Sequence, residues 1–182
     1  MLSCYRLLCQ YESSFQMEIK MNKYTGLLLI GLISTSVCQA SQITTTLHTT
    51  DGSNKSLGSV EFRDTSLGLL ITPNLQGVPV GLHGFHLHQN ANCSDKGMAA
   101  GGHFDPKNTN THQGPYGNGH LGDLPVLYVD TDGQAQTTTL APRLKTDDLK
   151  GLTLMVHAGG DNYTDMPSLG GGGARWACGV IK

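Results

Sequence analysis

Charged residues are scarce in this sequence. Asp, Glu, Lys and Arg make up only 14% of its 182 residues, whereas about a quarter of an average soluble domain is charged. The formal net charge is −2 at pH 7 and no run of basic residues occurs, so the sequence gives no reason to expect a nucleic-acid partner. Aromatic residues are also few, at 6%, while glycine is abundant, with 24 residues. This composition favours a loop-rich β protein over a helical one.

Apolar runs long enough to anchor the chain in a membrane are also missing. The most apolar stretch runs from about residue 26 to residue 33, after Lys23 and before small and polar residues. This three-part layout is typical of a secretory signal and falls short of the roughly 20 residues that a membrane helix needs. We therefore predict a signal peptide region at residues 1–40, with cleavage after Ala40, and a single exported domain at residues 41–182.

The predicted signal region has two further features. Met21 directly precedes the signal-like layout, so residues 1–20 are interpreted as an over-extended start. Cys38 is the type of residue that carries the lipid of a lipoprotein, but Val37 before it is larger than the small residue that lipid attachment favours. We expect an exported protein and no lipoprotein form.

Cysteine is sparse in the predicted mature chain. Of the five cysteines in the sequence, only Cys93 and Cys178 lie beyond residue 40. An even pair in an exported protein predicts one disulfide. The loop of about 86 residues that it would close corresponds to roughly 4.5 kcal/mol of loop-closure entropy. The alternative is a pair of free, buried thiols.

Turn residues separate eight stretches that are rich in β-forming residues or alternate apolar with polar. They predict strands near residues 42–49, 56–63, 67–73, 80–89, 125–130, 134–140, 152–158 and 175–181. Asp-Gly pairs at residues 51–52 and 132–133 are strong hairpin signals between such stretches. About eight short strands with turns between them favour a sandwich or a barrel.

Two long segments do not fit strands. Residues 90–124 are rich in Gly, Asn, Asp and His, and residues 159–174 end in Leu-Gly-Gly-Gly-Gly-Ala. Loops this long inside a compact domain are usually functional or disordered. The histidines in the first segment favour a functional loop.

Histidines are concentrated in one part of the chain, with six of the eight between residues 83 and 120. His86 and His88 are two apart on a predicted strand, so their side chains share a face and could chelate one ion. Taken alone, the pair is equally consistent with two solvated or hydrogen-bonded histidines. His157, on another predicted strand, could reach the same face.

The loop after this strand supplies a second set of candidate ligands. Three imidazoles and one carboxylate make a closed tetrahedral set of the kind that structural zinc takes, and the loop offers His103, His112, His120 and Asp123. With no Cys or Met beside them, the nitrogen ligands of both sets suit Cu(II) or Zn²⁺. A chance scatter of histidines would require several coincidences.

Five motifs together give the chain a specific family resemblance: GFHLHQ, GGHFDP, GDLP, VHAGGDNYTDMP and GGGGARWACGVI. The sequence resembles copper–zinc superoxide dismutases of the bacterial, exported type over essentially the whole predicted mature chain. The resemblance implies an all-β fold, an eight-stranded antiparallel Greek-key sandwich or barrel (immunoglobulin-like) with long metal-binding and active-site loops.

The same resemblance implies an activity and its cofactors. The enzyme would dismutate superoxide, its small-molecule substrate, to dioxygen and hydrogen peroxide at a copper centre cycling between Cu(II) and Cu(I). One copper and one zinc per subunit would share a bridging histidine. The implied role is antioxidant defence in the periplasm, with no nucleic-acid partner and no stable membrane span. Both a monomer and a homodimer stay open.

Roles for individual residues follow from the matching motifs. The resemblance implies that His86, His88, His103 and His157 hold copper, and that His103, His112, His120 and Asp123 hold zinc. His103 would then bridge the metals and also deliver a proton. Asp161 would link a copper histidine to a zinc histidine, Arg175 would attract superoxide, and Cys93 and Cys178 match the disulfide. We expect His83 to be structural and His48 to be a surface residue.

Three other protein classes are alternatives. A copper carrier would need the ligands but not Arg175, Asp161 or a bridging histidine. A zinc hydrolase would need an open zinc position with a carboxylate base nearby, whereas the zinc set here is full. An adhesive sandwich domain would account for the strands and for none of the histidines.

Overall fold

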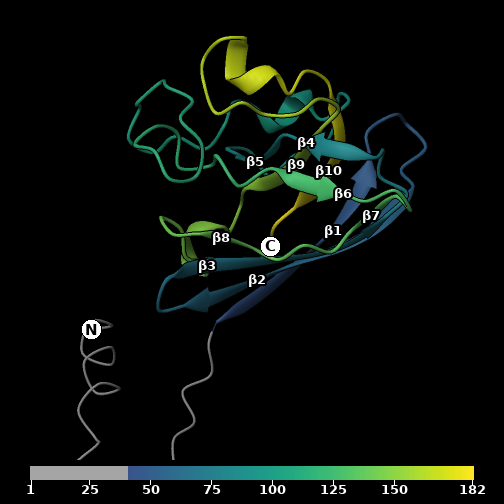
Figure 1. Ribbon diagram of the computed structural model, residues 1–182, viewed down its shortest axis with the longest axis horizontal. Coiled ribbons are helices and arrows are strands. Elements are labelled where there is room, and N and C mark those ends of the chain that lie inside the picture. Colours follow the sequence, from purple (N-terminus) through teal and green to yellow (C-terminus); the bar gives the residue numbers. More distant parts are fainter. Residues whose placement is uncertain (1–40) are drawn as a thin grey trace, which may run out of the picture. The chain divides into compact units, whose positions relative to one another are not determined.

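Ten strands and three short 3-10 helices make up the regular structure of residues 41–182, the part of the chain that the computed structural model describes (Figure 1). The strands are β1 (Gln42–Thr49), β2 (Ser56–Thr65), β3 (Gly68–Gln76), β4 (Gly81–His83), β5 (Phe85–His88), β6 (Leu127–Val129), β7 (Gln134–Ala135), β8 (Thr139–Ala141), β9 (Thr153–His157) and β10 (Arg175–Val180). The 3-10 helices are η2 (Met98–Ala100), η3 (Thr146–Asp148) and η4 (Ser168–Gly171).

The predicted signal peptide at residues 1–40 lies outside the described residues. Within residues 41–182, every helix falls short of the length and apolar character that a membrane crossing requires.

The order of strands in the sheet differs from their order along the chain. Eight strands form one sheet in the order β5-β9-β10-β1-β2-β3-β7, with β8 also paired to β3, and β4 pairs with β6. Every pair is antiparallel. Consecutive strands β1, β2 and β3 are neighbours, and the chain then crosses to the far edge of the sheet, where β5 lies beside β9. The predicted antiparallel Greek-key fold is confirmed.

Two of the eight predicted strands are each divided in two. The predicted strand at 80–89 is interrupted at Gly84, where the chain changes partner from β6 to β9. The predicted strand at 134–140 is interrupted at residues 136–138, although β7 and β8 both pair with β3. Pro73 of β3 would lie opposite this gap in the continued register, and proline has no N–H to donate to a ladder.

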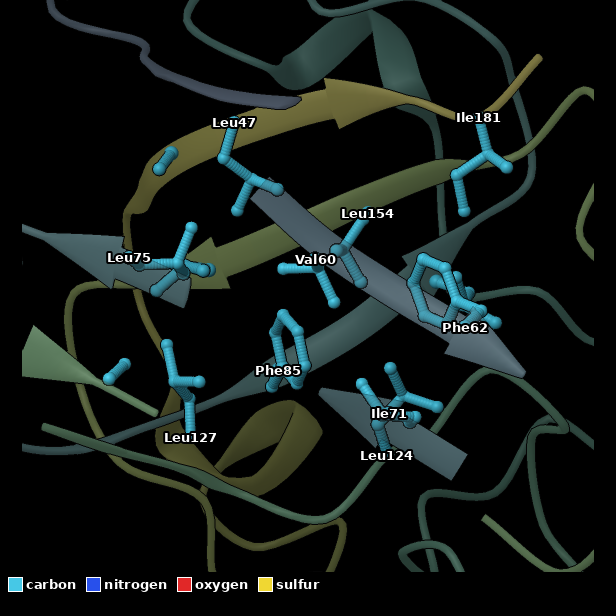
Figure 2. Packing of buried hydrophobic residues seen from close by; sticks show 14 of the residues in the cluster. Leu47, Val60, Phe62, Ile71, Leu75, Phe85, Leu124, Leu127, Leu154 and Ile181 are labelled. Carbon is cyan, nitrogen blue, oxygen red and sulfur yellow. The ribbon is translucent and has the colours of Figure 1, made fainter. Parts of the chain in front are cut away.

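Alternating apolar residues of the strands build a single main core. Figure 2 shows side chains from β1, β2, β3, β5 and β9 pointing toward one another, among them Leu47, Val60, Ile71, Phe85 and Leu154. All five are at most 1% exposed, and full burial of one such side chain is worth about 1.5–3 kcal/mol. The core therefore fixes which face of each strand is left for other functions.

In strand β5, one face packs into the core and the other face carries residues of the candidate site. Phe85 and Leu87 belong to the core, so the intervening His86 and the following His88 must face the opposite side of the strand. Both histidines are nevertheless fully buried, because residues of the long loop 90–124 lie against them and Asp161 contacts His86. This arrangement confirms the predicted orientation of the strand.

Candidate metal centre

Two clusters of buried side chains lie next to each other on the covered side of β5. We call them the first cluster (His86, His88, His103 and His157) and the second cluster (His103, His112, His120 and Asp123). Within each cluster, the potential ligand atoms all lie within 4.8 Å of one another. His103 belongs to both clusters, and every member is buried.

Neighbouring strands supply most of the first cluster. β5 carries His86 and His88, and its partner β9 ends at His157. The His157 backbone N–H donates to the carbonyl of Gly84 (2.8 Å), so the end of β9 is held beside the start of β5. The sheet therefore brings together histidines that are about 70 residues apart in the chain.

The loop that follows β5 returns along the strand's other edge and adds His103 and Asp123. Isolated antiparallel bridges pair His88 with His103 and His86 with Asp123. The Leu87 N–H donates to the Gly122 carbonyl (2.9 Å), and the Phe104 N–H donates to the Leu87 carbonyl (2.8 Å). A side chain at Gly122 would collide with the Leu87 carbonyl oxygen, so this close approach requires glycine.

Hydrogen bonds orient the imidazoles of the first cluster. The carbonyl of Gly101 lies 2.9 Å from His88 Nδ1, that of Gly173 lies 3.1 Å from His157 Nδ1, and Asp161 Oδ2 lies 2.7 Å from His86 Nε2. Because a carbonyl or a carboxylate can only accept, each of these nitrogens carries the N–H. The second nitrogen of each ring is left with a lone pair directed into the cluster.

Six buried ring nitrogens have no hydrogen-bond partner, and no other buried side-chain nitrogen or oxygen of residues 41–182 is in that state. They are His86 Nδ1, His88 Nε2, His103 Nε2, His112 Nδ1, His120 Nδ1 and His157 Nε2. A buried polar atom without a partner costs about 1–3 kcal/mol. Six of them converging at one place fit a pair of metal ions, which would accept their lone pairs.

Asp123 supplies the carboxylate of the second cluster. Its Oδ1 lies 2.9 Å from His103 Nδ1, and its Oδ2 lies 3.0 Å from His112 Nδ1. Oδ1 also lies 3.4 Å from His120 Nδ1. The contacts to His112 and His120 lack hydrogen-bond alignment, which is why both nitrogens are among the six without a partner. A cation among these atoms would satisfy all of them at once.

Asp161 joins the two clusters from outside. Its Oδ2 lies 2.7 Å from His86 Nε2 in the first cluster, and its Oδ1 lies 2.8 Å from His112 Nε2 in the second. The backbone N–H of Tyr163 donates to Oδ1 as well (2.7 Å). Gly170, at φ 73°, lies so close that a side chain there would collide with the Asp161 carboxylate.

The two clusters differ in electrostatics. Burial lowers the pKa of His86 to about 3, that of His88 to about 2 and that of His157 to about 4, so these imidazoles are neutral at pH 7. Burial also favours a lower pKa for His112. The hydrogen bonds and negative charges of Asp123 and Asp161 outweigh this effect and raise the pKa of His112 to about 9.

The pKa values of the carboxyl groups of Asp123 and Asp161 are lowered, although burial alone would raise them. Burial would raise the pKa of Asp123 and of Asp161, but hydrogen bonds from neighbouring histidines outweigh it and lower both pKa values. Both groups are therefore ionised, and Asp123 brings a negative charge to the second cluster. The first cluster offers only neutral nitrogens.

Arg175, the first residue of β10, lies beside the first cluster. Its guanidinium donates to the carbonyls of Gly97 (2.6 Å) and Gly101 (2.5 Å), and Gly101 also accepts from His88. Its charge contributes to the lowered pKa values of His88 and His157. A bulge at Trp176 shifts the register between β10 and β9, and bulges of this kind commonly re-aim a side chain.

The loop that Arg175 contacts is also tied to β10 covalently. Cys93 and Cys178 form a disulfide, so the predicted pairing is confirmed and the alternative of free thiols is wrong. His83 Nδ1 and Nε2 lie 2.8 Å from the carbonyls of His157 and Pro79, which confirms its structural role. His48 is partly exposed on β1.

Several residues with a role around the clusters were not predicted from the sequence. Asp165 Oδ1 accepts from the His112 backbone N–H (2.9 Å), and the Tyr163 hydroxyl accepts from the Val126 N–H (2.8 Å). Arg143 binds four backbone carbonyls of the loop that carries the second cluster. No spacing in the sequence marks these residues, because their partners are backbone groups 20 or more residues away.

Comparisons with known proteins agree on one family. The sequence model described as copper/zinc superoxide dismutase matches residues 56–181. A "Superoxide dismutase [Cu-Zn]" of Legionella pneumophila is 55% identical over 163 residues, covering 89% of this chain and all of that protein.

Solved structures give the same result. The Cu/Zn superoxide dismutase from Brucella abortus is 44% identical and superposes with a TM-score of 0.74, covering 78% of this chain and all of that one. The monomeric copper, zinc superoxide dismutase from Salmonella enterica is 49% identical with a TM-score of 0.68, and the coverage is the same.

Proposed function

The chain belongs to the copper/zinc superoxide dismutase family, and from this premise we propose which of its residues perform the reaction. As a member of the family it is an oxidoreductase that binds copper and zinc and dismutates superoxide. We assign copper to the first cluster and zinc to the second. The partnerless nitrogens support this assignment. The first cluster offers neutral imidazoles alone, which suit copper, and the second adds the carboxylate of Asp123, which zinc also accepts.

The observation that carries the proposal is the position of His103. Its Nδ1 faces Asp123 of the second cluster at 2.9 Å, its Nε2 has no partner, and the residue belongs to both clusters. We infer that Nε2 faces the first cluster. One imidazole with a nitrogen in each cluster can hold two cations only as a bridge that has given up both ring protons. We therefore propose that His103 bridges copper and zinc.

The residues around the clusters have distinct roles in the proposed reaction, in which two superoxide ions and two protons give dioxygen and hydrogen peroxide. Copper, when bound, supplies one-electron chemistry by alternating between Cu(II) and Cu(I), which zinc cannot do. Arg175 raises the local concentration of a small anion beside the first cluster. Whenever it is not bound to copper, His103 Nε2, which has no hydrogen-bond partner in the protein, could hold a proton and pass it to the reduced oxygen species.

Asp161 and Asp123 set the geometry for these roles. Through its two oxygens Asp161 fixes the tautomers of His86 and His112, so each presents Nδ1 to its cluster. The negative charge of Asp123 compensates part of the charge of two dications. We propose that both carboxylates act by positioning and charge and do not touch the substrate.

We propose that the enzyme is exported to the periplasm for antioxidant defence. Two features support this. The Cys93–Cys178 disulfide is of a kind that persists in oxidising compartments, and residues 1–40 carry the layout of a secretory signal. Cell fractionation with a protein carrying its natural N-terminus tests the location, and recovery in the cytoplasmic fraction would contradict it.

We also propose a homodimer that pairs through the outer face of β4 and β6. Leu82 and Tyr128 are register partners there, and they are 56% and 51% exposed, next to Val80 at 61%. Contiguous exposed apolar side chains of this kind favour a protein contact. Sedimentation of the wild type and of Leu82→Lys tests this proposal, and a wild type that sediments as a monomer at high concentration would contradict it.

The proposed function is tested by superoxide consumption with defined metal loading. The protein with both copper and zinc should consume superoxide, and His88→Ala should lose copper and activity together. His48→Ala is the matched control, because His48 lies on β1 outside both clusters, and it should behave as wild type. A wild type that binds copper without turnover would instead support a copper carrier.

A further inference from the structure

We infer that Arg143 is a positioning residue for the zinc site: its guanidinium clamps the backbone around His120 and holds the loop of the second cluster in its binding conformation. The inference rests on the proposed zinc role of that cluster. Arg143 lies just beyond β8 and is itself neither a cluster member nor in contact with the ligand nitrogens.

The contacts of Arg143 are all to backbone carbonyls of one loop. Its Nη2 donates to His120 (2.6 Å) and Gly114 (3.2 Å), its Nη1 to Gly119 (3.0 Å) and its Nε to Pro115 (3.0 Å). Four of the five N–H groups of the guanidinium are thus used. The acceptors lie on the two sides of residues 116–118, and the planar fork fixes their relative position.

The two pairs of acceptors, residues 114–115 and 119–120, are close in the chain to the proposed zinc ligands. Gly114 follows His112 by two residues. The carbonyl of His120 itself accepts from Arg143, and Asp123 follows His120 by three residues. The segment between residues 104 and 124 contains no strand or helix. Its local backbone bonds include only one across the turn, from the His120 N–H to the Thr111 carbonyl (2.9 Å). The clamp therefore supplies the order that secondary structure does not.

The outer side of the Arg143 guanidinium is not covered by tightly packed side chains. A hollow of about 470 Å³ opens there, lined by Asp105, Pro106, Lys107, Asn118, Gly119, Leu121 and Arg143. Other hydrogen bonds join neighbouring parts of this turn, from the His120 N–H to the Thr111 carbonyl (2.9 Å) and from the Asn118 N–H to Gln113 Oε1 (3.0 Å). The bonds from Arg143 add the restraint that holds residues 114–115 beside residues 119–120. The loss of these bonds should loosen His112 and His120 with respect to each other.

The test compares Arg143→Lys with Arg63→Lys, an exposed arginine on β2. Lysine keeps the charge but offers donors from a single atom, which cannot reach four carbonyls in the plane of a fork. We expect Arg143→Lys to bind zinc roughly 10–100-fold more weakly, the loss that supporting residues around a metal typically cause. Copper added alone should bind as in wild type, because all four members of the first cluster, His103 included, lie outside the segment 114–120 that Arg143 holds.

A spectroscopic measurement separates positioning from general stability. Co²⁺ placed in the zinc site reports ligand geometry by its visible absorption, and we expect a changed spectrum in Arg143→Lys and an unchanged one in Arg63→Lys. An unchanged zinc affinity with an unchanged spectrum would overturn the inference, and so would an equal loss of copper and zinc. A wild type that binds no zinc would instead overturn the proposed function.

A wild-type measurement covers the case in which Arg143→Lys does not fold. If the clamp and the zinc ligands are coupled, zinc binding must stabilise the clamp in return. We expect solvent exchange of the Arg143 Nε–H, followed by NMR of the purified protein, to slow by at least about tenfold when zinc is added. An exchange rate that is the same with and without zinc would overturn the inference.

Discussion

Zinc uptake by the metal-free protein should release a proton from His112. The carboxylates of Asp123 and Asp161 raise the pKa of this imidazole to about 9, so His112 carries a proton on each ring nitrogen at neutral pH. Zinc needs the lone pair of Nδ1, which the proton occupies. One proton must therefore leave for each zinc that binds.

The size of the effect follows from the distance between the working pH and this pKa. Because about pH 7 to 8 lies below the value of about 9, zinc affinity should rise about tenfold per pH unit in that range, or about 1.4 kcal/mol. The first cluster should behave differently. Burial lowers the pKa of His86 to about 3, that of His88 to about 2 and that of His157 to about 4, and it also lowers the pKa of His103. These imidazoles are therefore already neutral, and copper binding there should be nearly independent of pH.

Isothermal titration calorimetry measures the release directly. Titrating zinc into metal-free protein at about pH 8 in buffers of different ionisation enthalpy gives the number of protons released. We expect about one for the wild type and fewer for Asp161→Asn, which removes one of the two carboxylates beside His112. Zinc binding without proton release in the wild type, or equal release in both proteins, would refute the reasoning.

Three further predictions concern Arg175 and the loop beside it. Arg175→Ala should keep both metals but lose much of its catalytic rate. It should also lose much of its salt dependence, since salt screens the field of an exposed charge beyond about 8–10 Å. Arg175→Lys should restore part of the rate, and superimposable curves of superoxide consumption against ionic strength for the wild type and both variants would contradict this. Cys93→Ser should lower the free energy of unfolding by roughly 4.5 kcal/mol and release metal more readily, as denaturant titration and metal analysis can check; unchanged stability would contradict it. Thr50→Val removes a hydroxyl that donates to the carbonyls of Arg175 (2.6 Å) and Trp176 (3.1 Å) at the bulge. The rate of superoxide consumption should fall in Thr50→Val with both metals retained, and recover in Thr50→Ser. Equal rates for the two variants would contradict a role for the hydroxyl.

The sequence predicts this protein best where a pattern is local. Alternation along β5 is enough to place Phe85 in the core and His86 on the other face, because the side-chain period of a strand is two. The predicted strand at 80–89 was nevertheless too long, because the partner change at Gly84 depends on β6 and β9, which lie far away in the chain. Residue patterns contain no information on such a change of partner.

The candidate site shows the same division. Its histidines and carboxylates could be named from their motifs, and the structure brings them together in two adjoining clusters. The residues that hold the loops in place could not be named. Arg143 and Thr50 bind backbone carbonyls, and any residue type can provide a carbonyl. Their partners therefore leave no mark in the sequence.

The most direct test of the central claim is a crystal structure of the metal-loaded protein, with anomalous diffraction measured at the copper and zinc absorption edges. We predict one copper peak in the first cluster and one zinc peak in the second, with His103 between them. Nε2 of His103 should contact copper, and Nδ1 should contact zinc at about 2.0–2.1 Å. A single metal peak, the same metal in both clusters, or a His103 ring that contacts only one ion in the oxidised protein would contradict the account.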